Sequence, residues 1–193
     1  MRLHLARFNI LAALAAFAIL CGHAGISFAA SAEEQRGEIR KMRQQTLTHL
    51  YKVHPAAKTH LQKAAGYAVF SNVGINLIFL SAAGGSGVAH DNKTGRDIFM
   101  KMVSGGLGIG LGVKDFRGVF VFASHDGLKR FIDSGWEASA QADAAAKAGG
   151  KGGAAAGAIT VAPGVDLYQL TENGLALQAT IQGTKYYKND DLN

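Results

Sequence analysis

The spacing of apolar positions divides the chain into a leader, a helical segment and a longer segment of strands. Residues 8–20 are apolar except for Asn9. Between Glu33 and Val53, apolar or weakly polar side chains recur every three or four residues, which predicts one stripe of an amphipathic helix. The stripe consists of Ile39, Met42, Thr46, Leu50 and Val53.

A second, shorter helix is expected after Pro55, because proline suits the first turn of a helix, and Gly66 ends it after Ala65. Beyond Gly66 the apolar runs become short and alternate with turn residues, which predicts β-strands. Alternating glycines over residues 106–112 predict one further strand with a bare face. The other expected strands cover residues 67–70, 75–81, 88–91, 96–104, 119–123, 166–170 and 175–182.

Local turn signals connect these elements. Residues 92–95 are expected to join two strands as a hairpin, and Asn173-Gly174 is a second and stronger hairpin signal. Residues 124–132 predict one short helix after a capping serine or aspartate. The chain is therefore predicted to be an α+β protein. It has amphipathic helices over residues 33–65, then a glycine-rich antiparallel β-sheet or barrel-like domain over residues 66–193 with one short helix near 124–132.

The first 32 residues predict a secretory signal peptide. Two arginines precede the apolar run, which is too short to span a membrane comfortably, and small-x-small cleavage sequences follow at residues 27–29 and 30–32. The mature chain, residues 33–193, is then exported and is periplasmic or associated with the envelope membrane. An uncleaved anchor is the alternative. Lipidation of Cys21 is a weaker hypothesis, because Leu20 stands where a bacterial lipoprotein signal has a small residue.

Charge singles out the helical segment. The whole chain has a formal net charge of +6, and residues 64–193 balance their 11 basic residues with 11 acidic ones. The net charge of the mature chain therefore lies in residues 33–63, where seven basic residues face three glutamates. The seven are Arg36, Arg40, Lys41, Arg43, Lys52, Lys58 and Lys63.

A cationic helix with an apolar stripe can lie in the headgroup region of a membrane, where each basic residue contributes about 1 kcal/mol. These seven residues are therefore the candidate binding site for anionic phospholipid. A second interpretation fits the same pattern equally well. In it, the stripe packs on the β-domain and the basic row is a solvated face.

The sequence does not match the patterns typical of nucleotide-binding, catalytic or zinc-binding sites. The glycines of residues 106–110 lack the spacing of a dinucleotide-binding loop, and Ser124-His125-Asp126 are adjacent residues that suit a helix cap better than a catalytic triad. His49, His54 and His60 lack the spacing of a helical zinc motif. We therefore expect no enzymatic activity, no metal, no cofactor and no nucleic-acid partner.

Three stretches of the chain resemble the SYLF domain family over about residues 61–188. The first is the run Ala64-Ala65-Gly66-Tyr67-Ala68-Val69-Phe70-Ser71-Asn72-Val73, followed by the glycine-rich strand at 106–112. The second is Phe131-Ile132-Asp133-Ser134-Gly135-Trp136-Glu137. The third is the closing hairpin over residues 174–185. This hairpin and the Ser-Gly-Trp run are the most specific parts of the resemblance.

This resemblance implies lipid binding. Eukaryotic SYLF proteins bind phosphoinositides, some bundle actin filaments, and an amphipathic helix on the N-terminal side of the domain helps to engage the membrane. The present chain has no SH3 or FYVE domain, and export would separate it from cytoplasmic actin. Phosphatidylglycerol or cardiolipin then replaces phosphoinositide as the expected ligand. Two further hypotheses remain: an envelope scaffold that binds protein or filament partners, and a carrier that encloses an apolar ligand.

Overall fold

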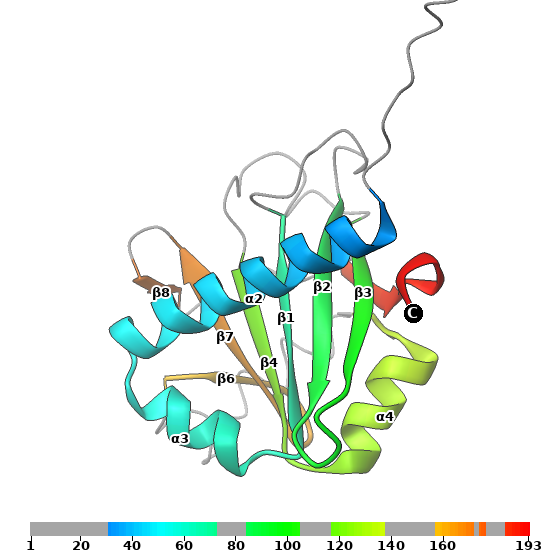
Figure 1. Ribbon diagram of the computed structural model, residues 1–193. Helices are drawn as coiled ribbons and strands as arrows, with labels where there is room; N and C mark the ends of the chain where they lie inside the picture. The colour runs from blue at the N-terminus through cyan, green and yellow to red at the C-terminus, as the bar shows by residue number, and fades with distance from the viewer. Residues whose placement is uncertain (1–30, 73–83, 105–116, 138–156, 172–173, 177–183) are drawn as a thin grey trace, which may run out of the picture. The chain divides into compact units, whose positions relative to one another are not determined.

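The computed structural model describes residues 31–72, 84–104, 117–137, 157–171, 174–176 and 184–193. By its internal contacts the chain divides into residues 1–31 and residues 32–193, and the fold described below belongs to the second unit (Figure 1). Residues 1–30 of the predicted signal peptide, Cys21 among them, lie outside the described residues. So do the strands expected at 75–81 and 106–112 and most of the closing hairpin.

The helices form where the sequence predicts them. Helix α2 covers Ala32–Val53, and helix α3 covers Ala56–Lys63 with Pro55 at its N-cap position. Helix α4 covers His125–Ser134, and the Ser124 hydroxyl caps it by accepting a hydrogen bond from the backbone N–H of Gly127. This confirms that Ser124 is a capping residue. A short 3₁₀ helix, η3, spans Asp190–Leu192.

Within the described residues, nine strands form one antiparallel sheet in the order β5-β9-β3-β2-β1-β4-β7-β6, with β8 added to β7. The prediction of an α+β protein with an antiparallel sheet is therefore confirmed. The strands are β1 (Gly66–Ser71), β2 (Gly84–Asp91), β3 (Asp97–Ser104), β4 (Arg117–Phe122), β5 (Trp136–Glu137), β6 (Ile159–Ala162), β7 (Val165–Thr171), β8 (Gly174–Ala176) and β9 (Thr184–Lys188).

The predicted hairpin at residues 92–95 is confirmed, since these residues join β2 to β3. Strands β7 and β8 pair antiparallel with Thr171 opposite Gly174, so Gly174 lies in β8, whereas Asn173 lies outside the described residues. The first turn also supports α3, because the Asn92 side-chain amide donates hydrogen bonds to the carbonyls of Leu61 and Ala64. These carbonyls belong to the last turn of α3 and its cap, which have no partner inside the helix.

Helices cover both faces of the sheet, and alternation along the strands sends successive side chains to opposite faces. Helices α2 and α3 cover one face, and α2 crosses the strands β4, β1 and β2 in Figure 1. The core on this side includes Val69, Val88, Phe99, Val119, Tyr168 and Leu170. Helix α4 covers the other face, over a core that includes Phe70, Met100, Phe120, Phe122, Phe131 and Tyr186.

The second core depends on glycine at one close approach. Phe70 on β1 stands directly between Gly87 on β2 and Gly118 on β4 in the strand register. The ring of Phe70 lies over Gly87, so that a Cβ atom at residue 87 would collide with the ring and with the carbonyl oxygen of Val69. Gly87 therefore leaves the space that Phe70, the largest side chain on the α4-facing side of β1, requires.

Alanine at position 87 should destabilise the protein by about 1–3 kcal/mol, because the Phe70 ring would have to leave its rotamer or the strands would have to separate. Chemical denaturation of Gly87→Ala measures this loss. The control is Gly37→Ala in α2, where nothing lies within 4 Å of the new methyl group. It should stabilise the helix by about 0.5–1 kcal/mol. Equal effects of the two substitutions would contradict the packing role of Gly87.

Candidate functional site

The apolar stripe of α2 packs against the sheet. Ile39, Met42, Thr46 and Leu50 are all buried in the structure, as one face of a helix should be when it lies on a core. The prediction that Val53 belongs to this stripe is wrong, since its side chain is 38% exposed. Val53 is the last residue of the helix, where the chain turns towards Pro55. Leu47, which the predicted stripe omits, is buried instead.

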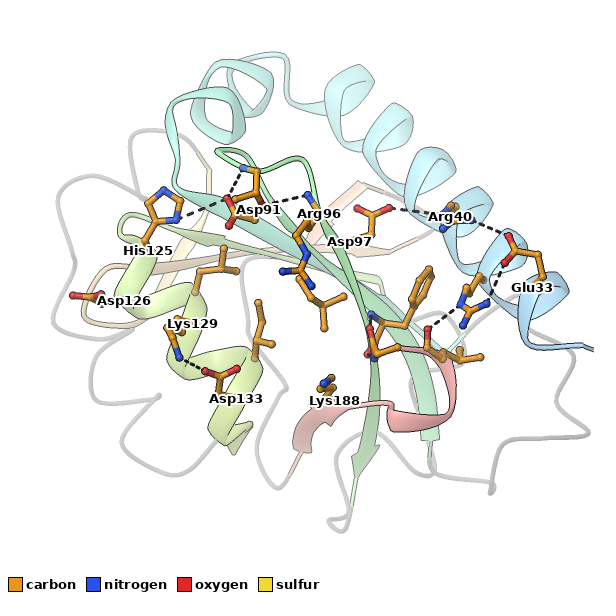
Figure 2. Close-up of a pocket in the computed structure, with 18 residues that line it drawn as sticks. Glu33, Arg40, Asp91, Arg96, Asp97, His125, Asp126, Lys129, Asp133 and Lys188 are labelled. Atoms are coloured by element: carbon orange, nitrogen blue, oxygen red, sulfur yellow. Dashed lines mark hydrogen bonds and ion pairs between the residues drawn. The ribbon is translucent and has the colours of Figure 1, made fainter.

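The three arginines of the candidate site lie along the flank of α2 that faces β3. Asp97, the first residue of β3, is the shared anion of two of them, Arg40 and Arg43, and Figure 2 shows its contact with Arg40. Arg43 donates to Asp97 Oδ1 at 2.5 Å, and Arg40 Nε lies 3.8 Å from Oδ2 of the same carboxylate. His90 Nδ1 lies 2.7 Å from Oδ1 as well. Asp97 therefore joins the helix to the β2–β3 hairpin.

The first turns of α2 are held at a second point. Arg36 Nε donates to the carbonyl of Leu192 in η3 at 2.9 Å, and Arg36 and Arg40 both pair with Glu33. The hydrogen bond from Arg36 lowers the pKa of the Glu33 carboxyl below its ordinary value, although partial desolvation acts against this. Arg40 also stacks over the ring of Phe99 at 5.3 Å. The arginines are thus occupied by the protein's own acids, carbonyls and rings.

The four lysines of the candidate site have a different environment. Lys41, Lys52, Lys58 and Lys63 are all exposed. Within the part of the chain that the structure describes, none of them has an acidic side chain within ion-pair distance. At about 3.6 residues per turn, Lys41 and Lys52 lie on the side of α2 opposite Ile39 and Leu50. They therefore point away from the sheet.

The structure consequently divides the seven predicted residues into two sets. Arg36, Arg40 and Arg43 hold α2 on the protein, while the four lysines are exposed on α2 and α3. We call this lysine set the lysine face, and it consists of Lys41, Lys52, Lys58 and Lys63. Cys21, the predicted lipidation residue, lies outside the described residues.

A second polar cluster, which the sequence does not reveal, joins α3 to β7. The His60 ring contacts the Tyr168 hydroxyl at 2.8 Å through Nδ1 and Asp166 at 3.4 Å through Nε2. Asp166 in turn accepts a hydrogen bond from Thr160 at 2.7 Å. Burial raises the pKa of the Tyr168 phenol to about 12, with a smaller contribution from the charge of Asp166. Tyr168 is fully buried, and through it the cluster fastens α3 to the sheet.

Two general features of the described residues bear on function. No described helix is long and apolar enough to cross a membrane. Nor do three His, Cys, Asp or Glu side chains come close enough together, in the same residues, to hold a metal ion.

Comparison with known proteins gives one informative likeness. No protein-family model matches the chain. The chain is similar to a protein named Beta cell expansion factor A from Aeromonas veronii, with 37% identity over 162 residues. The match covers 84% of this chain and 60% of the relative, so the chain spans about three fifths of the length of the curated protein that it matches.

Removing the charge of Asp97 should loosen α2. Asp97→Asn would leave the largely buried Arg43 guanidinium without its anion, which should lower the free energy of unfolding by about 1–3 kcal/mol. The control is Asp190→Asn, whose carboxylate is 91% exposed and lies 4.0 Å from Lys188. This change should cost less than about 0.5 kcal/mol. An Asp97 variant as stable as the control would mean that the apolar stripe alone holds the helix.

The raised pKa of Tyr168 predicts a loss of stability in alkali. Its phenol ionises near 10 when exposed and near 12 in the fold, so folding favours the protonated form. The resulting stabilisation is complete below pH 10 and is lost as the pH rises from 10 towards 12. Tyr168→Phe should therefore show a shallower decline of unfolding free energy over this range. An unchanged decline would assign it to the other buried tyrosines.

Proposed function

We propose that the protein is a SYLF-domain protein that binds anionic phospholipid at a membrane surface and catalyses no reaction. The observation that carries the proposal is the lysine face, four exposed cations on adjoining helices with no acidic partner among the described residues. An anionic surface attracts such a set, with about 1 kcal/mol from each basic residue. Four lysines together supply a few kcal/mol, which is enough for reversible binding.

The packing of α2 determines the mode of binding. Its apolar stripe is covered by the sheet, so the helix as folded offers lipid headgroups only its polar side. Contact is therefore electrostatic and peripheral, without insertion of the stripe among acyl chains. Such binding weakens with ionic strength, because salt screens exposed charges.

The positions of the motif residues support the SYLF assignment. The run at residues 64–73 contains β1, which lies in the middle of the sheet between β2 and β4. In the Ser-Gly-Trp run, Gly135 follows α4 with a φ of 69°, a conformation that favours glycine. The ring of Trp136 packs against Phe120 at 5.5 Å and Tyr186 at 5.8 Å. Residues that define the family resemblance thus have clear roles in building this fold.

The proposal predicts salt-sensitive binding to anionic vesicles that depends on the lysine face. The purified protein should sediment with phosphatidylglycerol vesicles at low salt and dissociate from them at high salt. It should not sediment with phosphatidylcholine vesicles. Lys41→Glu combined with Lys52→Glu should weaken binding by at least about tenfold, since two attractive charges become repulsive.

The matched control reverses two exposed cations elsewhere, Arg130→Glu with Lys185→Glu, and therefore has the same net charge. It should retain most of the binding. Equal losses in both variants would show that only net charge matters. If the protein binds no vesicle under any condition, the lipid proposal fails, and an envelope scaffold or a carrier of an enclosed apolar ligand takes its place.

A further inference from the structure

The described residues form a groove that none of the four lysines of the lysine face lines. It has a volume of about 810 Å³ and runs between α4, the start of β3 and η3, with the β2–β3 hairpin at one end (Figure 2). This is within the range of small-molecule sites, roughly 300–1,000 Å³. Its lining includes the first turns of α2 through Glu33, Arg36 and Arg40.

Part of the groove lining is apolar. Ile98 from β3 and Leu128 and Ile132 from α4 all line the hollow. Leu128 is buried, whereas Ile98 and Ile132 are only partly covered by the protein. A ligand with a hydrocarbon part would remove this partly exposed surface from water, which is favourable in proportion to the area covered.

The acidic and basic side chains around the groove differ in whether they have partners in the protein. Most of its acids already have partners in the protein: Glu33 pairs with Arg36, Asp97 with Arg43, Asp133 with Lys129, and Asp91 accepts from the backbone N–H of Lys93. The remaining lining acid, Asp126, points outward at the rim in Figure 2.

Arg96 is the exception among the cations. It is exposed, and within the described residues no carboxylate lies within ion-pair distance of its guanidinium. Figure 2 shows this guanidinium extending from the hairpin towards the middle of the groove. Lys188 lies towards the other end, and its single acidic neighbour, Asp190, is 4.0 Å away and 91% exposed. The unsatisfied charge in this groove is therefore positive.

The edge of β3 excludes one class of occupant. An extended peptide would have to pair with the outer backbone groups of β3 near Phe99. These groups are taken, because Phe99 N–H donates to the Asn193 side chain at 2.9 Å and the Phe99 carbonyl accepts from Asn189 N–H at 2.9 Å. The groove thus offers an apolar surface and a cation, with no free strand edge at that point.

We propose that this groove binds a single molecule of an anionic phosphate-bearing amphiphile. The phosphate pairs with Arg96, whose planar guanidinium can donate two parallel hydrogen bonds to phosphate oxygens, and the hydrocarbon lies over Ile98, Leu128 and Ile132. The choice of a lipid rests on the proposed function, but the site is distinct from the lysine face. The lysine face holds the protein on a bilayer, and the groove holds one lipid molecule.

The test uses lysophosphatidylglycerol below its micelle concentration, with ¹H–¹⁵N NMR of the purified protein. Saturable shifts should appear at the amides of Ile98, Leu128 and Ile132. Arg96→Glu should weaken binding by at least about tenfold through loss of a charge-assisted contact. Arg96→Lys should bind with intermediate affinity. Lys93→Glu, a charge reversal in the same turn, should leave affinity within about threefold, since Lys93 does not line the groove.

The other arms separate this proposal from the function proposed above. Lys41→Glu with Lys52→Glu should bind the monomeric lipid normally while losing vesicles. Inorganic phosphate that shifts the same amides with equal affinity would overturn the amphiphile assignment and leave an anion site. Vesicle binding without any monomer binding, or monomer binding insensitive to Arg96→Glu, would overturn the groove proposal alone. If the unsubstituted protein binds neither vesicles nor monomeric lysophosphatidylglycerol, both proposals are overturned.

Discussion

The docking of α2 on the sheet is the constraint on which the rest of the structure depends. The helix is long, its buried side is narrow, and most of its length lies over the strands β4, β1 and β2. Hydrophobic packing of the stripe holds the helix on the sheet but is non-directional. The ion pairs with Asp97 fix the orientation of the helix on the sheet. Because Arg43 and Arg40 reach the same carboxylate from consecutive turns, the helix can neither rotate nor slide without breaking an ion pair.

This constraint assigns the cations their roles. With the stripe turned to the sheet, residues at the side of the stripe face β3 and meet its carboxylate, and residues opposite the stripe face solvent. A single basic segment of sequence therefore becomes two surfaces with different chemistry. Neutralised arginines contribute little to the field outside the protein, so that the lysines dominate the potential over this part of the surface.

The sequence predicts those features that depend on near neighbours. The periodicity of residues 39–50 gives α2 its buried side, Ser124 gives α4 its cap, and the turn at residues 92–95 gives the β2–β3 hairpin. In each case the residues that decide the structure are a few positions apart. Val53 is the instructive failure, because its place on the stripe is correct for a helix of any length and the end of the helix removes it from the core.

Contacts between residues that are far apart in the sequence cannot be predicted from local sequence patterns. Arg43 and Asp97 are separated by 54 positions, and His60 and Tyr168 by 108. No local pattern marks either pair, since the crossing of a helix over a sheet decides which side chains meet. The groove is similar, because Arg96 and Lys188 come from elements that only the antiparallel arrangement of β3 and β9 brings together.

The contact between Arg36 and the carbonyl of Leu192 joins positions 156 residues apart. Beside it, Leu192 is buried in the same core as the α2 stripe. The packing of the first turns of α2 is therefore completed by residues far along the chain. Such a contact closes a very long loop, and contacts of this kind form slowly because most of the intervening chain must be ordered first. The N-terminal end of α2 is thus expected to reach its final position late in folding, after the sheet beneath it has formed.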